Sequence, residues 1–277
     1  MEHGSCEISS ELYSENDYKC DAGPTVNQKN VVSRFRFSLP PESVVDSDGD
    51  LVVPRKHSKP TETFIDLEHS QSTNLDLVGL QVWRGSLLLA DWLLCHSSSL
   101  PEDDYVLELA GGVGLATIVT SMFRPVICTD VNRGEIFDVI RANCARNNHL
   151  TARPVEVIEL DFQEAILPSK ITSLLPKVST IVAADVIYDD TLTDAFVETL
   201  GKLLAVPPKR RAYVALEKRY VFTVADRDCV APCYDYFLGR LDKLENVIAE
   251  QVEIDFPQYF RYDRVKELVL WRISSKF

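Results

Sequence analysis

The stretch that decides the fold is residues 104–115, Asp-Tyr-Val-Leu-Glu-Leu-Ala-Gly-Gly-Val-Gly-Leu, followed at 125–130 by Pro-Val-Ile-Cys-Thr-Asp. Residues 105–109 form a short apolar run of strand formers, and the small residues 110–114 allow a tight turn into a helix. The second stretch is again β-branched and ends in Asp130. We therefore predict a β-α-β unit with an acid at the tip of its second strand. Nucleoside-binding folds place there the carboxylate that accepts hydrogen bonds from ribose hydroxyls.

The class of nucleoside cofactor follows from what this turn lacks and from Glu108. A dinucleotide-binding fingerprint needs G-x-G-x-x-G, whereas residues 112–117 read Gly-Val-Gly-Leu-Ala-Thr. A carboxylate at Glu108, three residues before the first glycine, would repel a pyrophosphate. It suits S-adenosyl-L-methionine, which carries ammonium and sulfonium charges. The alternative is a glycine-rich turn that only connects a strand to a helix, and the presence of both Glu108 and Asp130 argues against it.

Length and composition indicate a globular enzyme. A chain of 277 residues is long enough for one sizeable core with a small appendage. The content of 45% hydrophobic and 26% charged residues is ordinary for such a protein. No run approaches the ~20 apolar residues that span a bilayer, and the polar N-terminus does not read as a signal peptide. We expect an intracellular protein, nuclear and/or cytoplasmic, without a membrane partner.

Cysteine usage and charge narrow the choice of ligands. The seven cysteines include no C-x-x-C pair, and Cys229 with Cys233 has no second pair at ligand spacing, so we predict reduced thiols and no metal. A net charge of −13 would be repelled by nucleic-acid phosphates. We therefore expect no direct grip on nucleic acid and favour a basic protein as the substrate.

The chain divides into three parts. We interpret residues 1–30 as a largely disordered acidic N-terminus because they are polar, charged and weakly periodic. Residues 31–74 form an N-terminal β extension, with strands expected at 31–39 and 63–67. The acidic stretch 46–50 imitates a calcium loop, but its glycine is misplaced, so we interpret it as a turn. The catalytic domain then covers residues 75–277.

Within this domain, periodicity predicts alternating helices and strands followed by two strands without a helix between them. Residues 163–178 read as a polar connection, and Asn132 with Glu135 reads as a capping pair for one helix. The order predicts an α/β fold that resembles the Rossmann-like, seven-stranded class I methyltransferase sheet, mostly parallel with an antiparallel last strand. Besides the opening unit, the predicted helices cover 86–95, 132–147, 193–205 and 232–244, and the strands cover 154–160, 180–184, 212–216, 247–254 and 268–273.

Several short motifs together resemble one family over residues 75–275. They are Val82-Trp83-Arg84, the glycine turn after Glu108, Thr129-Asp130, Leu160-Asp161-Phe162, Ala184-Asp185-Val186-Ile187-Tyr188 and Glu217-Lys218-Arg219. This set is similar to the seven-β-strand protein-lysine methyltransferases of the methyltransferase-like 21 group. The resemblance implies an S-adenosyl-L-methionine-dependent lysine N-methyltransferase that acts on a non-histone protein and is a monomer.

The same resemblance assigns a cofactor site. It implies that Asp130 takes the ribose hydroxyls, that Phe162 flanks the adenine and that the turn admits the methionine moiety. The family usually has Gly where Ala110 stands and Trp where Phe162 stands, so this chain carries an extra methyl group and lacks an indole donor. The implied cofactor-binding residues are Trp83, Glu108, Ala110, Gly111, Gly112, Asp130, Asp161, Phe162 and Ala184.

The catalytic residues implied by the family's D-x-x-Y motif are Asp185 and Tyr188. An in-line methyl transfer needs a neutral amine at near-attack distance, although the unperturbed pKa of lysine is ~10.4. Our hypothesis is that Asp185 and nearby carbonyls orient the amine, while Tyr188 walls the lysine channel. Alternatively, Asp185 caps the next helix and Tyr188 only packs. Trp83 is in the same way either a core anchor or an aromatic wall of the cofactor site.

Two other functions remain open from sequence. The first is a methyltransferase of the same fold that acts on histidine, arginine or a small molecule. The D-x-x-Y motif favours lysine as the target without excluding these. The second is a degenerate, non-catalytic module. Intact acids at Glu108, Asp130 and Asp185 argue against it, because a module without turnover has no need of all three together.

Overall fold

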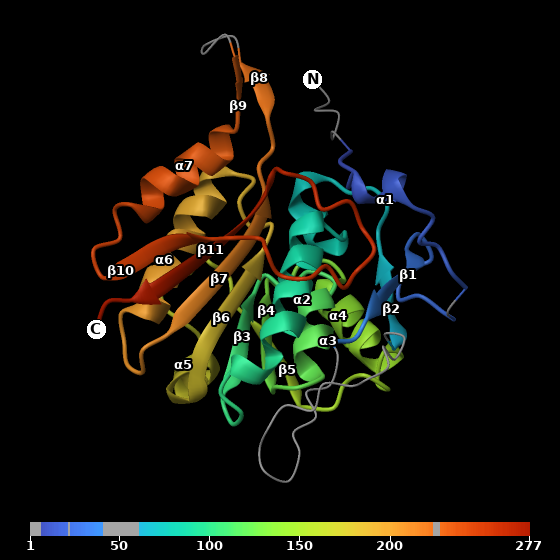
Figure 1. Ribbon diagram of the computed structural model, residues 1–277, viewed down its shortest axis with the longest axis horizontal. Coiled ribbons are helices and arrows are strands. Elements are labelled where there is room, and N and C mark those ends of the chain that lie inside the picture. Colours follow the sequence, from blue (N-terminus) through green and yellow to red (C-terminus); the bar gives the residue numbers. More distant parts are fainter. Residues whose placement is uncertain (1–6, 22, 41–60, 224–227) are drawn as a thin grey trace, which may run out of the picture.

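The computed structural model describes residues 7–21, 23–40, 61–223 and 228–277 (Figure 1). Its centre is a seven-stranded sheet in the order β10-β11-β7-β6-β3-β4-β5. Strands β7, β6, β3, β4 and β5 pair in parallel, and β11 pairs antiparallel with both β7 and β10, so that β11 alone runs opposite to the other six strands of this sheet. This arrangement confirms the predicted class I methyltransferase sheet with its antiparallel last strand. The strands are β3 (Tyr105–Leu109), β4 (Val126–Asp130), β5 (Val155–Glu159), β6 (Val178–Ala184), β7 (Arg211–Glu217), β10 (Val247–Val252) and β11 (Leu268–Ser275).

Helices cover both faces of the sheet (Figure 1). Alternation along β3 places Val106 in the core under α2, α3 and α4, and Leu107 in the core under α5, α6 and α7. Both side chains are buried, as expected for a parallel strand covered on two sides. The helices are α2 (Arg84–His96), α3 (Leu115–Ser121), α4 (Ile136–Arg146), α5 (Ser169–Leu174), α6 (Asp190–Leu204) and α7 (Pro232–Leu241), with 3-10 turns η1 (Leu75–Leu80), η2 (Ser97–Ser99) and η3 (Leu175–Lys177).

The N-terminal β extension is an antiparallel hairpin of β1 (Val31–Ser38) and β2 (Glu62–His69). Two fully buried asparagines, Asn143 of α4 and Asn147 at its C-terminal cap, attach it to the catalytic domain. The Asn147 side chain accepts from the N–H of Asp66 at 2.9 Å and donates to its carbonyl at 2.8 Å. Asn143 makes the same pair of bonds with Glu68, at 2.7 and 2.9 Å. The two amides therefore satisfy backbone groups of β2 that would otherwise be buried without partners.

The N-terminal segment differs from its prediction. We expected residues 1–30 to be largely disordered, but the described part contains α1 (Leu12–Glu15) and packs on the domain. Leu12 is fully buried in the core, and Tyr18 stacks on Phe35 with ring centroids 4.8 Å apart. The segment is too short to show a periodic pattern, and its order comes from contacts with residues far along the chain.

Three smaller predictions also differ. The connection at 163–178 contains α5 and η3, which the prolines obscured. The predicted capping pair does not cap α4, because Glu135 instead accepts from the side chains of Asn27 and Asn30. A short hairpin of β8 (Val221–Thr223) and β9 (Asp228–Val230) was not predicted. The acidic turn predicted at 46–50 lies outside the described residues.

Within the described residues, one helical stretch is apolar enough to cross a membrane by length and composition. It is Leu75–Ser99, which combines η1, α2 and η2, whereas we expected no such run from the sequence. In the structure 72% of its most apolar window is buried. Leu87, Leu88 and Leu89 of α2 have no exposed surface. The apolar composition is therefore accounted for by a central position in the core.

Candidate functional site

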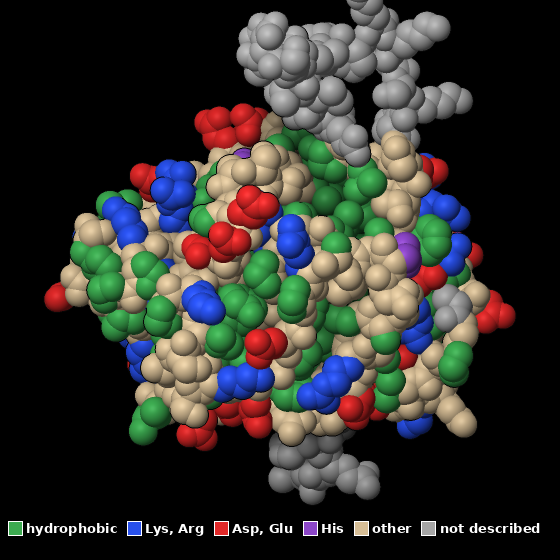
Figure 2. Space-filling view, turned by 90° about the horizontal axis from the view of Figure 1, so that it is seen from below, with side chains coloured by type: hydrophobic (Ala, Val, Ile, Leu, Met, Phe, Trp, Pro, Cys, Tyr) green, Lys and Arg blue, Asp and Glu red, His purple; other side chains and the backbone are tan. Residues whose placement is uncertain are grey.

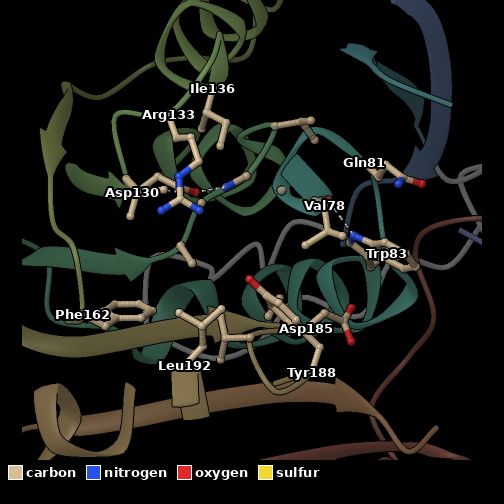
Figure 3. A pocket seen from close by; sticks show the side chains of 18 of the residues that line it. Val78, Gln81, Trp83, Asp130, Arg133, Ile136, Phe162, Asp185, Tyr188 and Leu192 are labelled. Atoms are coloured by element: carbon tan, nitrogen blue, oxygen red, sulfur yellow. Dashed lines mark hydrogen bonds between the residues drawn. The ribbon is translucent and has the colours of Figure 1, made fainter. Parts of the chain in front are cut away.

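A cavity of about 380 Å³ lies at the carboxyl ends of the parallel strands. Its size suits a small-molecule ligand. The structure brings every residue predicted for the site into its wall. These are Trp83, Glu108, Ala110, Gly111, Gly112, Asp130, Asp161, Phe162, Ala184, Asp185 and Tyr188. In Figure 3, Asp130 and Arg133 lie near one another, and Asp185 and Tyr188 lie together in another part of the cavity. The individual roles of these residues remain predictions.

The glycine turn after β3 exposes backbone to this cavity. Ala110 has a φ of 53° and Gly112 a φ of 56°, so both adopt the left-handed conformation. The N–H of Gly112 donates to Asp130 at 2.8 Å. A Cβ on Gly112 would lie 2.8 Å from the carbonyl oxygen of Gly79, which is too close. Glycine is thus required at 112, whereas the methyl group of Ala110 makes the left-handed backbone at that position strained.

Two buried acids lie on either side of this turn. Glu108 is 4% exposed and Asp130 is 7% exposed. Burial raises the pKa of Glu108 to about 8, although a hydrogen bond from the Thr117 hydroxyl opposes the shift. Burial also raises the pKa of Asp130 to about 6, against the N–H bonds from Gly112 and Val131. A cationic ligand would favour the ionised form of Glu108, whereas Asp130 is already mostly ionised at neutral pH.

Asp185 and Tyr188 follow the end of β6. Asp185 has a φ of 51°, and its carboxylate accepts from the N–H groups of Gly85 at 2.7 Å and Glu217 at 3.1 Å. Helix α6 is capped by a different residue, Asp189, which accepts from the N–H of Leu192 at 2.9 Å. The helix-capping alternative for Asp185 is therefore wrong. Burial raises the pKa of Asp185 to about 6 and that of Tyr188 to about 12.

Trp83 forms part of the cavity wall and also fixes its neighbours. Its indole Nε1 donates to the carbonyl of Val78 at 3.0 Å, which holds η1 over the cavity. The guanidinium carbon of Arg219 lies 4.5 Å from the ring centroid. Of the two readings of Trp83, the structure favours the aromatic wall.

Sequence reasoning missed one whole side of the cavity. Leu75, Val78 and Gly79 of η1 line it, as does Arg133 after β4. The segment 75–80 shows neither helical nor strand periodicity. Its place over the glycine turn depends on the contact between Gly79 and Gly112, which no local pattern records. Only the glycine at 79 hinted at a close approach of backbone.

The charges in the wall identify the kind of ligand that fits. Among the lining residues, six acids face one base, Arg133. The acids are Asp76, Glu108, Asp130, Asp161, Asp185 and Asp189. Elsewhere the charges are mixed, since Figure 2 shows Lys and Arg side chains interspersed with Asp and Glu on one face of the molecule. The acidic wall therefore suits a cofactor that carries cationic groups, and also a ligand with a cationic side chain. It disfavours a pyrophosphate.

Comparison with known proteins gives a consistent picture. Residues 62–228 match the family model described as lysine methyltransferase. Methyltransferase-like protein 22 of Mus musculus is 36% identical over 88% of this chain, and that of Homo sapiens is 34% identical over 90%. The chain spans 67% of each relative. From the sequence, Gln81–Gly85 and Glu217–Arg219 predict a similarity to methyltransferase-like protein 22, and these relatives confirm it.

More distant similarities have lower identity. Protein-lysine N-methyltransferase EFM3 of Chaetomium thermophilum is 26% identical over 51% of this chain and 43% of the relative. A solved S-adenosylmethionine-dependent methyltransferase from Aquifex aeolicus is 18% identical over 69% of this chain and 92% of its own, with a TM-score of 0.46. The glycopeptide N-methyltransferase MtfA, in complex with sinefungin, is 12% identical over 68% and 93%, with a TM-score of 0.45.

Proposed function

The chain belongs to the lysine methyltransferase family, and on that premise we propose that it methylates the side-chain nitrogen of a lysine in a non-histone protein. The fold and the family imply S-adenosyl-L-methionine as the cofactor. The observation that carries the proposal is the position of Asp185 and Tyr188 in the same acidic cavity as Glu108 and Asp130.

The chain's own residues account for cofactor binding. When bound, S-adenosyl-L-methionine supplies a methyl group on a positively charged sulfur. Asp130 would accept from the ribose hydroxyls, since its carboxylate is fixed by two backbone N–H groups. Phe162, held edge-on against Phe196 with ring centroids 5.5 Å apart, would flank the adenine. Glu108 would face the cationic methionine moiety, where its ionisation is favoured.

The substrate lysine must reach the site as a neutral amine, held in line with the methyl group. Asp185, with its pKa at about 6, is mostly ionised at neutral pH and would accept an N–H from the amine. Tyr188, with its pKa at about 12, stays a neutral phenol and is suited to a channel wall, not to a base. The acidic cavity also attracts a lysine before it loses its proton.

The partner that fits best is a basic protein. The net charge of −13 and the acidic cavity both favour a cationic surface over a nucleic acid. We propose that the chain acts as a monomer in the nucleus and/or the cytoplasm.

The experiment that tests the proposal has two parts. Calorimetry should detect binding of S-adenosyl-L-methionine and none of NAD. The protein is then incubated with isotopically labelled cofactor and cell extract, and the modified proteins are hydrolysed to amino acids. Label in methylated lysine supports the proposal. Label in histidine, in arginine or only in small molecules contradicts the lysine assignment, and binding without any transfer favours a non-catalytic module.

A further inference from the structure

The carboxylate of Asp185 is held by two distant parts of the chain. Its Oδ2 accepts from the N–H of Gly85 at 2.7 Å, in the first turn of α2. Its Oδ1 accepts from the N–H of Glu217 at 3.1 Å, at the end of β7. The orientation of the carboxylate therefore depends on how the start of α2 lies against the end of β7.

An ion pair joins these two ends directly. Arg84 immediately precedes Gly85, and its Nη1 lies 2.8 and 3.0 Å from the two carboxylate oxygens of Glu217. The Nε of Arg84 donates to Glu15, from the N-terminal segment. The side chains are 12% (Arg84), 14% (Glu217) and 4% (Glu15) exposed, so solvent screens these contacts only weakly.

The backbone at Asp185 needs such support. Its φ of 51° is unfavourable for a residue with a side chain. The N–H of Asp185 donates to the carbonyl of Ala215 in β7 at 2.9 Å, so the same strand holds both its backbone and its carboxylate.

We propose that Arg84 is a positioning residue that, by pairing with Glu217 and Glu15, holds the two N–H groups that orient the carboxylate of Asp185. The proposal rests on the proposed function of Asp185 as acceptor of the lysine amine. Through Glu15, it gives the N-terminal segment a role in the reaction. It also gives a reason for the presence of Arg84 in the Trp-Arg-Gly motif and of Glu217 in the Glu-Lys-Arg motif.

Gly85 offers an independent way to disturb the same carboxylate. A Cβ at this position would lie 2.7 Å from the Cγ of Asp185, so Gly85→Ala forces the carboxylate to move. A matched control is Gly239→Ala in α7, because a Cβ there meets no atom within 4 Å. For Arg84→Met the matched control is Arg34→Met, which breaks a pair of 2.7 Å contacts between Arg34 and Asp66 in the N-terminal hairpin.

The first test is kinetic and uses the full chain with isotopically labelled cofactor and a protein that the extract experiment shows to be methylated. Arg84→Met and Gly85→Ala should lower kcat by about 100-fold, while calorimetry shows a Kd for the cofactor within about twofold of wild type. Glu217→Gln keeps the backbone donor and should lower kcat less than Arg84→Met. Arg34→Met and Gly239→Ala should leave kcat unchanged. An unchanged kcat in Arg84→Met, or a loss that follows the cofactor Kd or the folded fraction, overturns the proposal.

The second test does not depend on turnover. The Asp185 carboxyl carbon is titrated by NMR and assigned with Asp185→Asn. The charged groups that face it are Glu217, at the end of β7, and Arg219, two residues later; Arg84 pairs with Glu217. Loss of the two N–H bonds in Arg84→Met should raise the pKa of Asp185 by about one unit, whereas Arg34→Met should leave the pKa of Asp185 unchanged. An unmoved titration overturns the positioning role, and methyl transfer by the wild type tests the proposed function separately.

Discussion

The hydroxyl group of Thr117, on α3, donates a hydrogen bond to the carboxyl group of Glu108, on β3, and Glu108 lines the cavity. This single donor does not compensate for the loss of water, and burial raises the pKa of Glu108 to about 8. The acid is therefore largely protonated at neutral pH when no cation faces it. A cationic ligand beside it would favour release of the proton.

This relationship predicts how stability changes with pH. The pKa of Glu108 is higher in the folded protein, about 8, than in the unfolded chain, about 4.5. Its contribution to the free energy of unfolding is therefore fully present below about pH 4.5 and is lost as the pH rises through about 8. Without cofactor, Glu108→Gln should gain at least about 1 kcal/mol of unfolding free energy relative to wild type between pH 5 and pH 9. Urea unfolding at several pH values measures this difference. A difference independent of pH would show that Glu108 is ionised in the folded protein.

The strained turn gives a second prediction. Ala110→Gly relieves the left-handed backbone at a φ of 53° and should raise the unfolding free energy by about 0.5–1 kcal/mol. The exposed loop residue Ala152 is a suitable control, because glycine there only adds freedom to the unfolded chain and should destabilise. Thermal unfolding compares the two variants. A lower Tm for Ala110→Gly would mean that its methyl group packs favourably.

Attachment of the N-terminal hairpin gives a third prediction. Asn147→Ala leaves the buried N–H and carbonyl of Asp66 without their side-chain partner, at a cost of about 2–4 kcal/mol. The neighbouring Asn148 is exposed, and Asn148→Ala should change stability by less than about 0.5 kcal/mol. Denaturant unfolding of both variants provides the comparison. Equal effects would show that the hairpin does not depend on these bonds.

Much of the fold could be predicted because its signals are local. The strands that end in Asp130 and Ala184 are buried runs of characteristic length, and the glycines of the turn mark the approach of backbone to a ligand. Parallel strands bring their carboxyl ends to one edge, so residues of the site separated along the chain could be placed together.

The parts that could not be predicted depend on contacts between distant residues. Nothing local to Asn147 shows that its amide imitates a strand partner for Asp66, and nothing around Leu12 shows that it enters the core. The support of the Asp185 carboxylate is likewise invisible in sequence, because Gly85 lies 100 positions away. In each case both residues are present in the sequence, but no local pattern shows that they are in contact.

The measurement that tests the central claim most directly is transfer of a heavy methyl group from labelled S-adenosyl-L-methionine into extract proteins, read by mass spectrometry. Wild type is compared with Asp185→Asn, because Asn tolerates the left-handed backbone at this position; it removes the charge and leaves one of the two N–H groups, of Gly85 or Glu217, without its acceptor. We predict label on lysine with the wild type and at least about a tenfold loss with the variant, while cofactor binding persists. Lysine label that is equally strong with Asp185→Asn, or no lysine label from a wild type that binds the cofactor, would contradict the account.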